Sequence, residues 1–98
     1  MGKLEAAAEQ YLNDQVELLF GVTRKYTSPG RKGVADRLCF FPKGNLYLVE
    51  MKTYSGKETT AQSRERERMQ DLGFRCVIAY GKAGVDQFII RVKKELGL

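Results

Sequence analysis

The sequence predicts an α/β fold with the element order α-β-β-β-α-β-α, in which a mixed sheet is flanked by helices. Three observations predict it. Apolar residues recur at helical spacing in stretches near both ends of the chain. Two strand-like runs are joined by the tight connection Pro42-Lys43-Gly44-Asn45, which is typical of a hairpin. A helical stretch then precedes a last apolar strand, and such a crossover places that strand parallel to a neighbour.

The bounds of each element follow from periodicity and from the residues that interrupt it. A helix is expected up to Leu19, because apolar residues keep helical spacing to that point and Gly21 ends the pattern. A capping box that begins at Thr59 starts the second helix, and Gly73 stops it. The expected helices are Leu4–Leu19, Thr60–Leu72 and Asp86–Leu96, and the expected strands are Val22–Tyr26, Ala35–Phe41, Leu46–Thr53 and Phe74–Tyr80.

Composition limits the functional classes. With 98 residues, the chain is expected to form one domain over residues 1–98. No apolar run is long enough to span a bilayer and the N-terminus lacks a signal-peptide pattern, so no membrane partner and a cytoplasmic location are expected. Cys39 and Cys76 lie in apolar stretches and are expected to be buried, reduced thiols. The chain has no histidine, which excludes His-based metal sites and His-dependent catalysis.

The charge pattern points to a polyanionic partner. The net charge is +5, and between Leu18 and Val49 the only acidic residue is Asp36. A lone acid within a basic tract predicts a nucleic-acid-binding surface, and the alternative is a basic surface that serves only solubility. Arg31 and Lys32, just before Asp36, are expected to contact backbone phosphates. The other basic residues of this tract are Arg24, Lys25, Arg37 and Lys43.

Three charged residues form the candidate site. Glu50 and Lys52 are two apart on a predicted strand and therefore share one face, together with Leu46 and Leu48. If the hairpin turns about Lys43, Asp36 pairs with Glu50 on the same side of the sheet. Opposed carboxylates destabilise a ladder, so the pair requires either a raised pKa or a bound cation. Oxygen ligands without histidine or thiolate favour Mg²⁺ or Mn²⁺.

This set of residues suits hydrolysis of a phosphodiester. A metal ion held by Asp36 and Glu50 can polarise the phosphate and lower the pKa of a bound water. The Met51 carbonyl lies between them and is a candidate third ligand. Lys52 can orient the attacking water or offset charge in the transition state. The alternative interpretation is a surface hairpin that carries a salt bridge.

Three further residues are candidates for supporting roles. Gln62 is expected on the inner side of the second helix, where it can bond Lys52 or a metal-bound water, although it also fits the capping box. Glu5 and Glu9 flank the apolar stripe of the first helix, and either can reach the metal through water; both also fit as favourable acids near a helix N-terminus. The alternating charges of residues 64–68 are expected to form a solvated helix face.

Taken together, these residues resemble the VRR-NUC (virus-type replication-repair nuclease) family, a branch of the PD-(D/E)xK nucleases. One departure is Ala35, where the family usually has proline before the metal-binding aspartate; proline there supplies backbone shape rather than a ligand. The matching stretches are Glu5–Leu12, Ser28–Leu38, Val49–Lys52, Gln62 and Leu72–Phe74.

The resemblance implies a restriction-endonuclease-like core and a role for each residue. It implies Asp36 and Glu50 as metal ligands, Lys52 as the catalytic lysine and Gln62 as its supporter. It also implies a first-helix glutamate near the metal, with Glu9 preferred and Glu5 as the alternate.

The resemblance also implies a standalone member of the type found in phages and bacteria. Such members are similar to homodimeric Holliday-junction resolvases, so branched DNA and a homodimer are expected. The alternatives are a flap or single-strand nuclease that acts as a monomer, and a catalytically idle nucleic-acid-binding module on the same fold. The chain is too short to add the recognition domain of a sequence-specific restriction enzyme.

Overall fold

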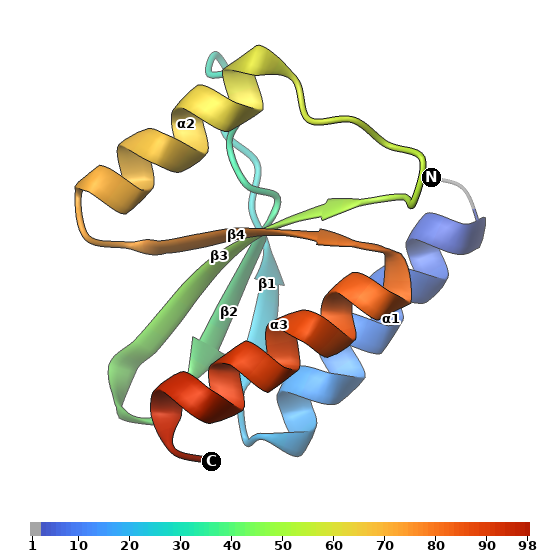
Figure 1. Cartoon of the computed structure of the whole chain (residues 1–98), viewed down its shortest axis with the longest axis vertical. Coiled ribbons are helices and arrows are strands. Elements are labelled where there is room, and N and C mark those ends of the chain that lie inside the picture. The colour runs from blue at the N-terminus through green and yellow to red at the C-terminus, as the bar shows by residue number, and fades with distance from the viewer. Residues whose placement is uncertain (1–2) are drawn as a thin grey trace.

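The computed structural model describes residues 3–98, with side chains from residue 6 onward. The chain forms the predicted order of elements, with a short 3₁₀ turn inside the hairpin (Figure 1). In the described part of the chain, no helix combines the length and apolarity needed to cross a membrane. The elements are α1 (Lys3–Leu18), β1 (Val22–Lys25), β2 (Arg37–Phe41), η1 (Pro42–Gly44), β3 (Asn45–Lys52), α2 (Thr60–Asp71), β4 (Arg75–Tyr80) and α3 (Gly81–Leu96).

The four strands form one mixed sheet in the order β1-β2-β3-β4. β1, β2 and β3 are antiparallel neighbours, whereas β4 lies parallel to β3. This arrangement follows from the connections, because a tight turn joins β2 to β3 while α2 carries the chain from β3 to β4. Figure 1 shows α2 on one side of the sheet and both α1 and α3 on the other. The predicted fold class is therefore confirmed.

The main core lies between the sheet and the α1/α3 pair. Tyr47 and Val49 of β3 are fully buried there, and the Tyr47 ring makes edge contacts with Phe41 and Phe88. The Tyr47 hydroxyl donates to Glu95 at 2.6 Å, which satisfies its polar end. The other residues of this core are Leu12, Val16, Cys39, Val77, Ala79, Val85, Ile89 and Val92.

The opposite face of β3 is less covered. Leu46 and Leu48, which share a face with Glu50 and Lys52, are only half-buried. The reason is that α2 is highly polar and its only buried residue is Glu65. Glu50 and Lys52, at the end of β3, therefore lie on the face of the sheet covered by α2, the layer that buries fewer apolar side chains.

Most predicted bounds agree with the structure within two residues, and α3 is the exception. It begins at Gly81 rather than at Asp86, because close packing overrides the weak helix propensity of its two glycines. A Cβ at Gly84 would lie 2.8 Å from the Ala79 carbonyl carbon, so glycine lets the new helix pack directly on β4. At the other end of the chain, Phe20 takes the left-handed conformation that ends α1, with φ 64°, where Gly21 was expected to do so. Cys39 and Cys76 are free and buried, as predicted.

Candidate active site

The candidate site lies where β2 begins and β3 ends. The hairpin register pairs Arg37 with Val49, which is the register predicted from the sequence. Continued by one residue, this register places Asp36 opposite Glu50. The structure thus brings the two acids together at the end of the ladder, beside Lys52.

Backbone hydrogen bonds fix Asp36. Its Oδ1 accepts the Met51 amide at 3.1 Å, and its carbonyl accepts the Tyr26 amide at 2.9 Å. Burial raises the pKa of the Asp36 carboxyl above its ordinary value; the Met51 amide opposes this, and the charge of Glu9 adds to it. The N–H and C=O of a strand residue point to the same edge, so the Met51 carbonyl is also directed toward the side of Asp36.

Glu50 carries the largest electrostatic conflict of the site. Burial, followed by the charge of Asp36, raises the pKa of Glu50 to about 7, although Lys52 opposes the shift. Its Oε1 accepts from Gln62 Nε2 at 3.0 Å, whereas its Oε2 is buried and has no hydrogen-bond partner among the described residues. A buried carboxylate oxygen that lacks a donor, next to a second acid, is uncompensated, and a cation could supply the missing partner.

Gln62 is held in place by the helix cap. The Gln62 amide donates to Thr59 Oγ1 at 3.1 Å, and Gln62 Oε1 accepts from the Thr59 amide at 2.9 Å. With its Oε1 so occupied, the side-chain amide directs Nε2 to Glu50. Gln62 thus belongs to the capping box and reaches the site as well; its partner is Glu50, not Lys52.

A glycine lets the loop before Asp36 approach the start of α2. Gly33 has φ +81°, and a Cβ at this position would lie 2.4 Å from the Ala61 carbonyl oxygen. Both the conformation and the close approach exclude larger residues. This contact holds the loop before Asp36 against the start of α2, the helix that carries Gln62.

A groove of about 710 Å³ opens on the site. Asp36, Met51 and Lys52 line it, with Glu9 from α1 and Lys25 from β1 on its walls. Glu50 borders a separate small cleft beside Gln62 and α2. The site is therefore reached from the α1 side, while Glu50 contributes from the side of α2.

The first-helix acids are only partly placed at the site. Glu9 Oε2 forms an ion pair with Arg37 at 3.2 Å, and both side chains are largely buried. The side chain of Glu5 lies outside the described residues. Among the residues described, no group of three or more acidic, histidine or cysteine side chains gathers into a metal-binding cluster. The oxygens that fit a cation are those of Asp36, Glu50 and the Met51 backbone.

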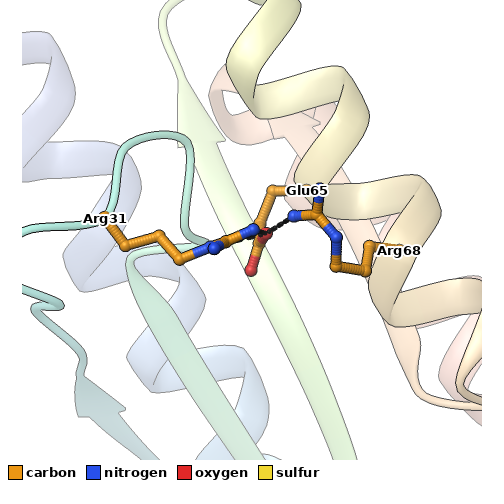
Figure 2. A network of polar contacts seen from close by, with 3 residues as sticks. All are labelled: Arg31, Glu65 and Arg68. Atoms are coloured by element: carbon orange, nitrogen blue, oxygen red, sulfur yellow. Dashed lines mark hydrogen bonds and ion pairs between the residues drawn. The ribbon is translucent and has the colours of Figure 1, made fainter.

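The basic residues of the tract divide into two groups. Arg24, Lys25 and Lys32 are exposed, and Lys25 also lines the groove. Arg31 is half-exposed, and its Nη2 lies 3.1 Å from Glu65 Oε1 (Figure 2). Arg37 is the partner of Glu9, and its side chain is only 13% exposed. A phosphate contact by Arg37 would therefore require the loss of an internal ion pair.

Two features of this region were not predicted. Residues 64–68 were expected to form a solvated face, but Glu65 is buried and accepts from both Arg31 and Arg68. The two guanidinium groups compensate the buried charge, and the partner from the loop is far away in sequence. Tyr54 lines the groove two residues after the end of β3; an exposed aromatic residue in a polar loop was the available signal.

Known proteins resemble this chain in sequence and in structure. No family model matches it. It is 38% identical to "Putative nuclease p44" of Acyrthosiphon pisum secondary endosymbiont phage 1 over 74 residues, which are 76% of this chain and 80% of the phage protein. A solved structure described as "VRR_NUC domain" has a TM-score of 0.82 and 30% identity, over 90% of this chain and 96% of the other. A second, "VRR_NUC domain protein", has a TM-score of 0.71 and 16% identity, over 93% and 88%.

Proposed function

We propose, from the premise that this chain belongs to the VRR_NUC domain family, that it cuts DNA with a divalent metal ion held by Asp36 and Glu50. The chain is a nuclease, a hydrolase of nucleic acid phosphodiester bonds. DNA as the substrate, Mg²⁺ or Mn²⁺ as the cofactor and the role of each residue belong to the proposal. Residues 1–98 would act as one catalytic domain, in the cytoplasm of a bacterium or of a phage-infected host cell.

The observation that carries the proposal is the buried Glu50 Oε2, which has no hydrogen-bond donor among the described residues and lies beside a second acid. A divalent cation resolves both problems, because it supplies a partner for this oxygen and offsets the repulsion between the carboxylates. When bound, such an ion polarises a phosphate oxygen and makes a bound water more acidic. Asp36, Glu50 and the Met51 carbonyl would hold it.

The remaining residues position the reacting groups and supply positive charge. Lys52 lines the groove beside Asp36, where its ammonium group can orient the attacking water and offset negative charge on the phosphate. Gln62 donates to Glu50 Oε1 and so holds this carboxylate in place. Lys25 and Lys32 would bind phosphates next to the scissile one.

One panel of substrates tests the proposal. The protein is incubated with labelled duplex, flap, single-stranded and four-way DNA in Mg²⁺, Mn²⁺, Ca²⁺ or EDTA. Mg²⁺ and Mn²⁺ should support cleavage, EDTA should stop it, and Ca²⁺ should permit binding with little turnover, because it prefers longer bonds and more ligands. Lys52→Ala should abolish cleavage, whereas Lys94→Ala, an exposed lysine on α3, should not. Full activity in EDTA would refute the metal mechanism.

The preferred substrate is proposed to be branched DNA, cut by a homodimer. One chain carries one Asp36–Glu50–Lys52 site, whereas resolution of a four-way junction requires two symmetry-related cuts. On α3, the apolar residues Phe88, Ile89 and Val92 belong to the core and so cannot form the dimer interface. Ile90, which is 66% exposed, remains available on α3, as do Ala6 and Ala7 on α1.

A mixed dimer of wild type and Lys52→Ala tests this assignment. It should nick one strand of a junction per binding event and rarely resolve the junction. A protein that remains a monomer in light scattering with DNA bound, and that cuts flaps or single strands in preference to junctions, would contradict it. Binding without cleavage under every metal condition would instead indicate an idle binding module.

A further inference from the structure

An exposed tyrosine lies at the mouth of the groove. Tyr54 follows the catalytic strand by two positions and lines the same groove as Asp36 and Lys52. Its side chain is 67% exposed, which is high for a large aromatic residue next to a catalytic site. Lys25, Lys52 and Lys82 line the same groove, so its walls carry three basic side chains.

Three contacts hold this ring in one place. Residues 53–56 form a turn closed by the Gly56 amide, which donates to the Thr53 carbonyl at 3.0 Å. The Tyr54 hydroxyl accepts from the Ala83 amide at 3.2 Å. The third contact is with Gly81, where a Cβ would lie 2.5 to 2.9 Å from the three ring carbons around the hydroxyl. The ring is thus fixed to the start of α3, although it is open to solvent.

The geometry of the Gly81 contact shows which part of the ring stays free. An atom close to all three carbons around the hydroxyl must lie above the ring face, because the hydroxyl blocks an approach in the ring plane. Gly81 therefore covers one face of Tyr54, and its φ of +61° reinforces the requirement for glycine. Since the residue is 67% exposed although one ring face is covered, the other face is open to solvent at the groove that Tyr54 lines.

We propose that the free face of Tyr54 stacks on an unpaired nucleobase adjacent to the scissile phosphate. A fixed aromatic ring in a basic groove is a stacking platform for bases, and it loses little conformational freedom on binding. This inference rests on the proposed function, because it uses the phosphate position at Lys52. It also defines the substrate class: a base inside a continuous duplex stacks on its neighbours, whereas a base at a branch, flap or single strand offers a free face.

Fluorescence of 2-aminopurine tests the stacking directly. The cut position is first mapped in Mg²⁺, and 2-aminopurine is then placed on each side of it in DNA bound in Ca²⁺. Wild type should quench the probe at one of the two positions. Tyr54→Phe keeps the ring and should keep the quench, whereas Tyr54→Leu should lose it and raise KM roughly tenfold with little change in kcat. Phe74→Leu changes a half-exposed aromatic residue just before β4; it is the control and should behave as wild type.

The outcomes separate this inference from the proposed function. Cleavage by wild type without any Tyr54-dependent quench would overturn the stacking role and leave the nuclease assignment intact. Wild type that quenches the probe but cuts as fast in EDTA as in Mg²⁺ would refute the metal mechanism and retain the stacking role of Tyr54. A Tyr54→Leu variant that loses activity without loss of quench would show that Tyr54 only supports the start of α3, and this too would overturn the inference. Circular dichroism confirms that each variant is folded.

Discussion

Glu50 is the residue at which stability and activity conflict. Its carboxylate is partly desolvated, faces Asp36 and leaves one oxygen without a donor. The free protein would gain stability if this charge were absent, whereas metal binding requires it. Natural sequences retain such conflicts at functional sites, because the ligand resolves them.

A neutral side chain at this position should therefore separate the two properties. Glu50→Gln should abolish cleavage and, without metal at pH 8, raise the melting temperature by a few degrees, because about 1 kcal/mol corresponds to roughly 4–8 °C in a domain of this size. Calorimetry in EDTA and a cleavage assay check both effects. Glu95→Gln is the control. The pKa of Glu95 is lowered by its hydrogen bond to Tyr47, so its charge stabilises the fold, and this variant should have a lower melting temperature than wild type. If Glu50→Gln cut DNA near the wild-type rate, Glu50 would not be a required metal ligand.

The pKa of Glu50 gives metal binding a pH dependence. The pKa is raised from 4.5 in the unfolded chain to about 7 in the folded protein, so the folded state binds the proton more tightly. The stability of the metal-free protein should therefore fall as pH rises from about 4.5 to about 7. A metal ion competes with this proton, so the apparent affinity for Mn²⁺ should rise up to about tenfold per pH unit below 7 and level off above it. Titration calorimetry from pH 5.5 to 8.5 measures this, and an affinity independent of pH would contradict it.

The candidate site was predictable where it depended on local pattern. A tight turn and strand periodicity were sufficient to place Asp36 opposite Glu50 with Lys52 beside them. The partner of Glu9 was not predictable, because its pairing with Arg37 depends on how α1 packs over the sheet. From the sequence, Glu9 was expected near the metal and Arg37 within the DNA-binding tract, whereas in the fold the two side chains form an ion pair with each other.

At the scale of elements, the N-terminus of α2 connects a helix cap to the site. Thr59 accepts the Gln62 amide, and Gln62 in turn reaches Glu50. Thr59→Ala should therefore lower the free energy of unfolding by about 1 kcal/mol and also reduce the cleavage rate, because it loosens Gln62. Denaturant unfolding and single-turnover cleavage measure the two effects. Thr60→Ala is the matched control, since Thr60 lies one residue later without a capping role; an equal loss of rate in both variants would refute the coupling.

The loop before Asp36 should bind DNA through Lys32 more than through Arg31. Lys32 is exposed, whereas Arg31 is engaged by the buried Glu65. Lys32→Ala should weaken binding to every DNA structure and lower the salt slope by roughly one unit. Arg31→Ala should in addition lower the melting temperature, because it leaves Glu65 with less compensation.

Fluorescence anisotropy at several salt concentrations measures the slopes for the loop variants. Lys43→Ala, in the turn at the other end of the hairpin, is the control and should leave the slope unchanged. An effect of Lys32→Ala on only one DNA structure would indicate that the loop reads shape instead.

Element bounds were predictable except where packing overrides propensity. The capping box and Gly73 bound α2 correctly, since these signals act within one or two turns. The start of α3 at Gly81 was missed, because its glycines are used for close contact with Tyr54 and with the Ala79 backbone. A glycine that signals a turn locally can serve a tertiary contact instead.

At the scale of the molecule, the order of elements and the mixed sheet followed from the sequence, whereas the unequal thickness of the two layers did not. A strand with apolar residues on both faces does not reveal which face is covered better. The deciding fact is that α2 buries only Glu65, while α3 alone buries Val85, Phe88, Ile89 and Val92.

This inequality implies that the molecule does not open as one unit. The α2 layer should detach in partial unfolding events that leave the sheet and the α1/α3 layer intact, because little apolar area resists its separation. In native-state hydrogen exchange, the amides of α2 should lose protection at least about tenfold faster than those in the middle of α3. Mn²⁺ should slow exchange in α2 selectively, since Gln62 joins this helix to Glu50, the proposed metal ligand. Equal protection in α2 and α3 would show that both layers unfold together. Faster exchange in α2 would mean that Gln62, which positions Glu50, belongs to the least stable part of the fold.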